Sequence, residues 1–415
     1  MRFVPALGLT SVPALMRKAG GVSIPPADQK SVPAGVLPQA QADMTDLDGW
    51  TIGPSWTDQG GALQKFAGAS QEFIQSDIIE IPAGDIWVSY TARDATAGVT
   101  GVQLQGPFRN SVMQNKVTAQ HIARFDSVGH TRVRAFGTNT YDGTFDDLQV
   151  VDMNEILAQP ADIYIAAGQS MIAAENNSFP VDPDKDFWIP RCLFVPGVDN
   201  PTYGSVAGVR TGCVAPLQMS GTTQGVSPAT TFARMVEGST AAGRSILILG
   251  CAAGGTRLVG NDAEWHPDAT VGNGATLYNT MITRIIDALA LNPGNVVKGL
   301  IWGQGESDRS MSMDVDYPPA FGAMLSALRA DTGKPNLPVM LIGPMPDDTT
   351  STQPMFIATQ EKLDQDSGDA SAIAGVHYIA RPTGYMSDDG THPVAEGNRI
   401  AGRLAAQRFI AEGYL

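Results

Sequence analysis

From residue 159 onward, short uninterrupted apolar runs alternate with longer amphipathic stretches. The apolar runs predict buried strands at 163–167, 245–249, 299–302, 339–342 and 376–379. The amphipathic stretches predict helices over 228–236, 277–291, 320–330, 356–363 and 395–411. Strands that are apolar on both faces and alternate with helices are typical of a parallel sheet covered on both sides. Such sheets bind their ligands at the carboxyl ends of the strands.

The pattern between residues 45 and 158 is different. Short alternating runs, separated by Gly, Pro and Asp clusters, lie at 73–81, 86–91, 99–104, 132–136 and 148–151. No segment here has a clear helical period, so the pattern predicts a small antiparallel β-sandwich. Trp50, Trp56 and Trp87 fit either a sandwich core or an aromatic platform that binds sugar, and burial preference favours the core.

Residues 1–44 are predicted to form a Pro-rich arm. The prolines among them exclude long helices and central strands, so the arm is either an unstructured tail or a segment that orders only against a partner. The first residues resemble a secretory signal only in part, because Pro5 and Pro13 interrupt the apolar stretch. The chain is therefore predicted to have three parts, at 1–44, 45–158 and 159–415.

Composition excludes several classes of protein. With 27 Lys and Arg against 42 Asp and Glu, the net charge is −15, which leaves little to neutralise the phosphates of a nucleic acid. Three cysteines are too few for a disulfide framework and fit no zinc-binding spacing. No dinucleotide-binding glycine motif follows a predicted strand, so neither a metal nor a cofactor is expected. No apolar run approaches the roughly 18–20 residues of a membrane span.

Polar or glycine-rich segments directly follow four of the five predicted strands. They lie at 168–171, 251–256, 302–308 and 388–393. The first contains Ser170, a hydroxyl that becomes a nucleophile only when a base can remove its proton. Of the five histidines, only His392 follows the last strand and has an aspartate, Asp389, three residues earlier. These three residues form the predicted catalytic triad, with Asp388 as the rival for the acid position.

Acyl transfer also requires hydrogen-bond donors for the developing oxyanion. The backbone N–H groups of Ser170 and Gly255 and the side-chain amide of Gln304 are the predicted donors. Glycine at 254 and 255 allows the backbone to approach a substrate without an intervening Cβ.

These segments resemble the sequence blocks of the SGNH-hydrolase superfamily, in its sialate O-acetylesterase and acetylxylan-esterase branch, carbohydrate esterase family 6. The matching residues are Gly168-Gln169-Ser170, Gly254-Gly255-Thr256, Trp302 to Asp308 and Asp389 to Pro393, in that order. The resemblance covers about residues 161–415 and implies a three-layer α/β hydrolase that deacetylates carbohydrate. One position departs from the family: Met171 replaces an asparagine that helps to order the loops around the serine.

Other residues of these segments are predicted to support the site or to line a sugar pocket: Gln169, Gly254, Thr256, Arg257, Trp265 and Glu306. For Arg257 and Trp265, a surface salt bridge and a core indole are equally good interpretations. Glu306 is expected to orient neighbouring groups and Asp308 to act as a loop or cap residue, although the pair resembles the two carboxylates of a glycosidase. Cys251 is interpreted as a buried thiol.

The sequence thus predicts a serine esterase that removes O-acetyl groups from a polysaccharide or a sialic-acid-type glycan through an acetyl-enzyme. The alternative is a glycan-binding or structural protein of a virion or phage tail spike, with an esterase fold of weak or no activity. In that case the arm docks the chain to a larger assembly or to further copies of itself. An extracellular or virion-associated location is expected, and a cytoplasmic one stays open.

Overall fold

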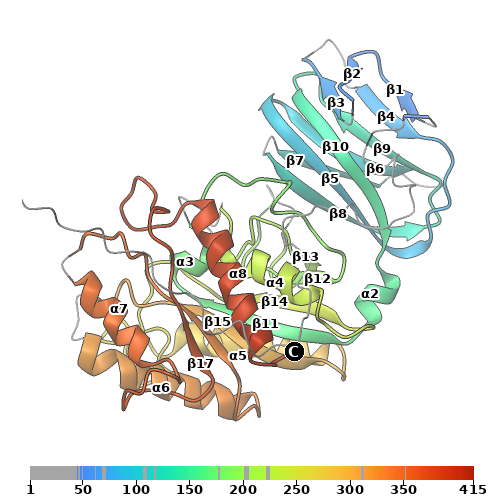
Figure 1. Cartoon of the computed structure of the whole chain (residues 1–415). Helices are drawn as coiled ribbons and strands as arrows, with labels where there is room; N and C mark the ends of the chain where they lie inside the picture. The colour runs from blue at the N-terminus through green and yellow to red at the C-terminus, as the bar shows by residue number, and fades with distance from the viewer. Residues whose placement is uncertain are drawn as a thin grey trace, which may run out of the picture.

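The computed structural model describes residues 44, 47–48, 50–60, 62–67, 72–105, 110–115, 118–175, 178–200, 205–220, 225–309, 313–350 and 352–415. Except for Met44, the predicted arm lies outside these residues. The described chain has an all-β part followed by a part in which strands and helices alternate (Figure 1).

A seven-stranded sheet forms the centre of the second part, in the order β13-β12-β14-β11-β15-β16-β17. Its strands are β11 (Ala161–Gly168), β12 (Cys192–Val195), β13 (Thr211–Gly212), β14 (Ser245–Gly250), β15 (Val296–Gly303), β16 (Val339–Ile342) and β17 (Val376–Ile379). All neighbouring strands are parallel except β13, which runs antiparallel to β12. The five strands predicted from apolar runs are all present. The short strands β12 and β13 were not predicted.

Helices cover both faces of this sheet: α4 (Pro228–Glu237), α5 (Thr276–Ala290), α6 (Met313–Asp331), α7 (Gln353–Lys362) and α8 (Ala395–Ala411). Alternate residues of β11 point to opposite faces. Ile163 and Ile165 belong to the core shared with α5, α6 and α7, whereas Tyr164 and Ala166 pack with α4 and α8. Helix α6 begins at Met313, earlier than predicted, and continues through Pro318 and Pro319.

The all-β part consists of two five-stranded antiparallel sheets, in the orders β1-β4-β9-β6-β7 and β2-β3-β10-β5-β8. The strands are β1 (Trp50–Ile52), β2 (Trp56–Asp58), β3 (Leu63–Lys65), β4 (Glu72–Ser76), β5 (Ala83–Ala97), β6 (Val99–Gln105), β7 (Asn110–Asn115), β8 (Ala119–Val128), β9 (Arg132–Gly137) and β10 (Asp142–Asp152). The two sheets share one hydrophobic core, to which both Trp56 and Trp50 contribute. The sequence did not reveal β8, because its polar side chains obscure the alternation.

The two parts of the chain meet along β5 and β8. Trp87 is 2 % exposed and stacks on Trp188, with ring centroids 5.7 Å apart. The side chain of Gln120 accepts the Trp188 backbone N–H at 2.6 Å, and Arg93 pairs with Asp184 at 2.9 Å. Trp56 and Trp87 are therefore core residues and do not form an exposed platform. The chain passes between the parts through α2 (Asn154–Ala158).

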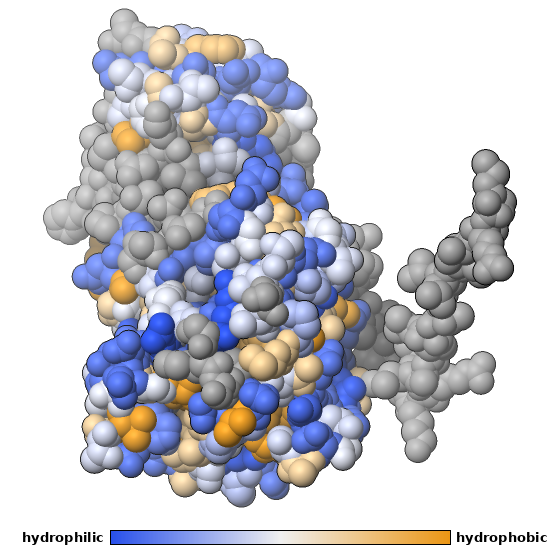
Figure 2. All heavy atoms as spheres, turned by 90° about the vertical axis from the view of Figure 1, so that its left-hand side faces the viewer, coloured by the Kyte–Doolittle hydropathy of each residue, from blue (hydrophilic) through white to orange (hydrophobic). Residues whose placement is uncertain are grey.

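Among the described helices, none has the length and apolar character needed to cross a membrane. Figure 2 shows one face of the molecule, on which hydrophilic residues predominate and hydrophobic ones occur in small groups between them. A surface of this kind agrees with a net charge of −15.

Gly168 is expected to be essential for the central strand. Its φ is +120°, and a Cβ there would lie 2.1 Å from the carbonyl oxygen of Gly303. Gly168→Ala should therefore lower the free energy of unfolding of this part by about 2–4 kcal/mol, through strain and a backbone clash. The control is Gly322→Ala, inside α6 with its nearest contact at 3.9 Å, which should raise that free energy by about 0.5–1 kcal/mol. Urea unfolding followed by tryptophan fluorescence measures both, and equal effects would contradict the expectation.

Candidate active site

Ser170, His392 and Asp389 form a continuous chain of hydrogen bonds. Ser170 is the first residue of α3 (Ser170–Ala173), directly after the central strand β11. Its Oγ lies 2.8 Å from His392 Nε2, and His392 Nδ1 lies 2.6 Å from Asp389 Oδ2. Asp388 and Asp389 are both exposed, but within the described part of the chain no hydrogen bond joins Asp388 to His392. The structure thus brings the three predicted residues together and favours Asp389 over its rival.

The loop between β17 and α8 holds Asp389 as an anion. Burial alone would raise the pKa of this carboxyl. Hydrogen bonds from the His392 backbone N–H and ring, from the Ser387 hydroxyl and from the Thr391 N–H outweigh burial and hold the pKa well below its usual range. An ionised Asp389 fixes the proton on His392 Nδ1 and leaves Nε2 to accept the proton of Ser170.

Gln169 joins the ends of β11 and β15. Its side chain is 1 % exposed; Oε1 accepts the Gly305 N–H at 2.7 Å, and Nε2 donates to the Ser307 hydroxyl at 2.7 Å. Both ends of the amide are therefore used to hold the two loops at a fixed separation. This arrangement agrees with the supporting role that the sequence suggested for Gln169.

Two of the three predicted oxyanion donors have free N–H groups. Among the contacts of the described residues, no hydrogen bond uses the backbone N–H of Ser170 or of Gly255. Gly255 has a φ of +73°, is exposed, and faces open space where a Cβ would lie. Such a glycine presents its backbone to a ligand at no steric cost.

The third predicted donor, Gln304, is placed differently. It is 1 % exposed, and its Nε2 donates to Asp308 Oδ2 at 2.5 Å and to the Thr256 carbonyl at 3.2 Å. Because these bonds use both amide hydrogens, Gln304 has none left for an oxyanion. The prediction is corrected: Gln304 supports the glycine loop and does not donate to the substrate.

Asp308 was predicted to be a loop or cap residue, and it lies in a turn after β15. It is fully buried, and its carboxylate accepts the backbone N–H groups of Leu258 at 3.0 Å and Val259 at 3.4 Å. Burial raises the pKa of Asp308, and the hydrogen bonds from Gln304 and these N–H groups oppose that rise. With its oxygens engaged in this way, Asp308 holds the glycine loop and does not form a glycosidase pair with Glu306.

Thr256, Trp265 and Arg257 follow the two glycines. Trp265 is 0 % exposed, packs edge-on against Trp302 and donates its indole N–H to Thr256 Oγ1 at 2.8 Å. It supports the loop from the core, so it does not line a sugar pocket. Arg257 pairs with Asp262 at 3.3 Å near the surface, which agrees with its interpretation as a salt bridge.

Glu306 is close enough to His392 for the two side chains to interact electrostatically. Its Oε2 is buried and has no hydrogen-bond partner within the described chain. Burial raises the pKa of Glu306, although the positive charge of the nearby Arg381 and the proximity of His392 oppose that rise. Arg381 is 5 % exposed and uses Nε and Nη1 for bonds to the Gly343 carbonyl and the Asn398 side chain.

The remaining histidines lie elsewhere. His121 and His130 belong to the all-β part, and His266 accepts the Asp268 N–H at 3.2 Å through Nδ1.

A cavity of about 460 Å³ lies where the two parts of the chain meet. It is lined by Trp87, Arg124 and Arg210 among others, and none of the candidate site residues lines it. Cys251 is buried, and burial raises the pKa of its thiol.

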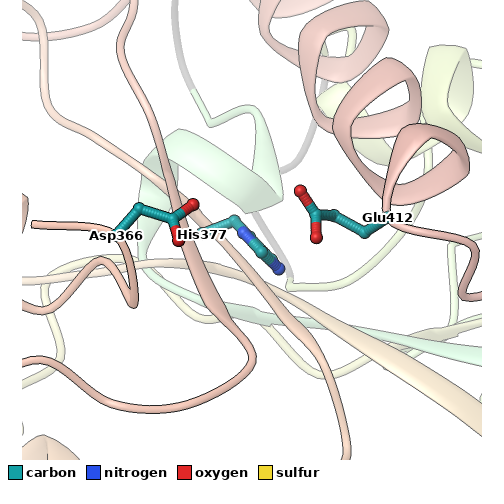
Figure 3. Close-up of side chains that lie close together, drawn as sticks. All are labelled: Asp366, His377 and Glu412. Carbon is teal, nitrogen blue, oxygen red and sulfur yellow. The ribbon is translucent and has the colours of Figure 1, made fainter. Parts of the chain in front are cut away.

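Asp366, His377 and Glu412 are the one group in the described residues that resembles a metal site (Figure 3). Arg408 occupies it with its own positive charge: Nη2 lies 2.5 Å from Asp366, and Nε lies 3.0 Å from His377 Nδ1 and 3.1 Å from Glu412. His377 Nε2 bonds to the Tyr414 hydroxyl at 2.8 Å. With both ring nitrogens engaged, this donor set does not fit a metal and instead fastens α8 to β17.

Comparison with known proteins finds similarity to one family over part of the chain. Residues 206–411 match the family model described as carbohydrate esterase, sialic acid-specific acetylesterase. The matched segment is just under half of the chain. It contains Gly255, Asp389 and His392, whereas Ser170 precedes it.

A stretch of 94 residues is 33 % identical to the probable 9-O-acetyl-N-acetylneuraminic acid deacetylase of Escherichia coli K12. That stretch is 21 % of this chain and 29 % of the relative, so the match spans less than a third of the relative's length.

Solved structures that can be superposed on this chain include a protein of Arabidopsis thaliana. It is 20 % identical with a TM-score of 0.48, and the superposition covers 62 % of this chain and 100 % of that protein. The structure of NanS is 19 % identical with a TM-score of 0.45 and covers 61 % and 99 %. A carbohydrate acetylesterase from Xanthomonas citri is 19 % identical with a TM-score of 0.38 and covers 82 % and 72 %.

The Arg408 cluster predicts a pH-dependent stability. Burial, followed by the positive charge of Arg408, lowers the pKa of His377 below its ordinary value, and Glu412, Asp364 and Asp366 only partly oppose this. The unfolded chain then binds a proton more readily than the folded one, so stability is complete above about pH 6.5 and decreases as the pH falls below it. The melting temperature of the wild type should fall more steeply than that of His377→Gln between about pH 7.5 and 5. Parallel curves would contradict this assignment.

Proposed function

We propose that the protein is a serine esterase that removes O-acetyl groups from carbohydrate through an acetyl-enzyme. The observation that carries the proposal is the hydrogen-bonded chain from Ser170 through His392 to Asp389 at the carboxyl end of β11. The family description over residues 206–411 supports the same chemistry. Membership of the SGNH superfamily, and of its carbohydrate esterase family 6 branch, is the finer part of this proposal and rests on the four sequence segments.

In the first half of the reaction, His392 Nε2 removes the proton of Ser170 Oγ as the oxygen attacks the acetyl carbonyl carbon. Asp389 stabilises the imidazolium that forms. The N–H groups of Ser170 and Gly255 donate to the carbonyl oxygen as it becomes negative. His392 then gives its proton to the sugar oxygen, the ester bond to the sugar breaks, and the acetyl group remains bonded to Ser170 Oγ.

In the second half of the reaction, water takes the place of the Ser170 hydroxyl as nucleophile, and Ser170 becomes the leaving group. A water molecule loses a proton to His392 and attacks the acetyl carbon, and the same two N–H groups stabilise the new oxyanion. The proton returns to Ser170 Oγ as its bond to the acetyl group breaks, so acetate leaves and the hydroxyl is restored. Each step uses only residues of this chain and water.

The substrate in this proposal is an acetylated polysaccharide or a sialic-acid-type glycan. The net charge of −15 provides no general attraction for acidic glycans, and Arg257 is already paired with Asp262. Binding of an acidic sugar would therefore depend on other local groups.

The domain division at 1–44, 45–158 and 159–415 stays part of the proposal, with a β-sandwich as its second unit. Glycan binding by residues 45–158, docking to an assembly through the arm, and an extracellular or virion-associated location also stay predictions. A glycan-binding protein without activity is less favoured, because the three side chains are already in hydrogen-bond contact.

Ser170→Ala should remove the nucleophile without disturbing the fold. Turnover of p-nitrophenyl acetate, and acetate release from an acetylated glycan, should fall by about 10³-fold or more. Ser326→Ala, an exposed position on α6, is the matched control and should keep wild-type rates. Wild-type turnover by Ser170→Ala would disprove the mechanism. Glycan binding without turnover by the wild type would favour the binding protein.

Asp389 and Asp388 allow a comparison between adjacent aspartates. Asp389→Asn removes the charge that fixes the His392 tautomer, so kcat should fall by about 10²–10⁴-fold. Asp388→Asn removes an equal charge from the preceding residue, which makes no bond to His392 in the described structure, and should change kcat by less than about twofold. Steady-state kinetics on one acetyl ester measures both variants. Equal losses would assign the effect to loop charge rather than to the triad.

A further inference from the structure

Glu175 connects the segment around Ser170 to the glycine loop. It lies two residues beyond α3, and its own N–H donates to the Ser170 carbonyl at 3.3 Å. Its side chain is 9 % exposed, and Oε1 accepts the Gly254 N–H at 3.0 Å as well as the hydroxyl of Ser220. One carboxylate thus joins the turn that carries the candidate nucleophile to the loop that follows β14.

Glycine at 254 leaves room for this carboxylate. A Cβ at 254 would lie 1.9 Å from Glu175 Oε2, so the Glu175 side chain would have to move away. Gly255 is glycine for a different reason, since its φ is +73° and the space beside it is open. The first glycine therefore leaves room for Glu175, and the second is exposed.

Hydrogen bonds to the rest of the protein hold the glycine loop at residues 253, 254 and 256. The Ala253 N–H donates to the Gly168 carbonyl at 2.9 Å, and the Thr256 hydroxyl donates to the Ala253 carbonyl at 2.7 Å. The Gly254 N–H is held by Glu175. These bonds hold the peptide unit that precedes the Gly254 Cα, and the next unit carries the Gly255 N–H, for which no bond is seen within the described residues.

Met171 does not provide such a link. It is 2 % exposed, and its thioether is at most a weak hydrogen-bond acceptor. We propose that Glu175 is a positioning residue, which fixes the Gly254–Gly255 loop so that the Gly255 N–H stabilises the oxyanion of acyl transfer. This inference rests on the proposed esterase function and adds to it the group that orders the oxyanion donor.

The first experiment compares two substitutions of Glu175 with p-nitrophenyl acetate. Glu175→Ala removes the acceptor for the Gly254 N–H, so kcat should fall by about 10–100-fold while KM changes by less than about threefold. Glu175→Gln keeps an acceptor oxygen and should retain at least about a third of the wild-type kcat. Melting temperatures show that each variant is folded. Equal losses in both variants would contradict positioning through this acceptor.

A double-mutant cycle tests the contact itself. Gly254→Ala should lower kcat in the wild type, because its Cβ displaces Glu175. In the Glu175→Ala background the same substitution has no carboxylate to displace and should change kcat by less than about threefold. Additive losses would contradict the inference, since they would show that the two positions act independently.

Amide hydrogen exchange gives a readout that does not need activity. Exchange at residues 253–256 should accelerate by about tenfold or more in Glu175→Ala and stay near the wild-type rate in Glu175→Gln. If the wild type hydrolyses no acetyl ester, the proposed function fails, while exchange still shows whether Glu175 holds the loop. If the wild type is active but Glu175→Ala leaves both kcat and exchange unchanged, the assignment of Glu175 is overturned.

Discussion

The parallel pairing of β11 with β14 and β15 is the constraint on which the candidate site depends. It aligns the carboxyl ends of three strands, so that Ser170, the glycine loop and Gln304 leave the sheet beside one another. Gly168 allows β11 to end directly against Gly303, where a larger residue would collide with its carbonyl. The nucleophile therefore occupies a position set by backbone geometry, and His392 reaches it from the loop before α8.

A layer of buried polar groups holds the loops that follow these strands. Gln169 bonds to the segment after β15, Asp308 bonds to the backbone after the glycine loop, and Glu175 bonds to the loop itself. Burying a carboxylate or an amide is unfavourable unless hydrogen bonds compensate for the lost water. Because these bonds require particular partners on other loops, the same groups also specify how the loops are arranged. Rigidity of this kind suits a site that must stabilise charge without reorganising.

The charges around the imidazole differ in their environment. Asp389 is partly exposed and is kept ionised by hydrogen bonds, whereas the pKa of Glu306 is raised by burial. Only Asp389 of these two carboxyl groups is hydrogen-bonded to His392 within the described residues. The family match over residues 206–411 includes both, together with the glycine loop, while the strand that carries Ser170 lies outside it. The link between the matched and unmatched segments is made by contacts such as that of His392 with Ser170.

The sequence by itself determined the alternation of strands and helices, because continuous apolar runs and amphipathic periods record burial directly. It also identified Ser170, His392 and Asp389, since few histidines compete and only one follows a strand end with a nearby aspartate. The polar side chains of β8 obscure its alternation, and β12 was also missed. Only the tertiary structure decided that Gln304 is already bonded, that Trp265 lies in the core, and that Glu175 meets Gly254 across 79 positions of the chain. Side-chain hydrogen bonds depend on which loops the fold brings together, and no local pattern encodes that.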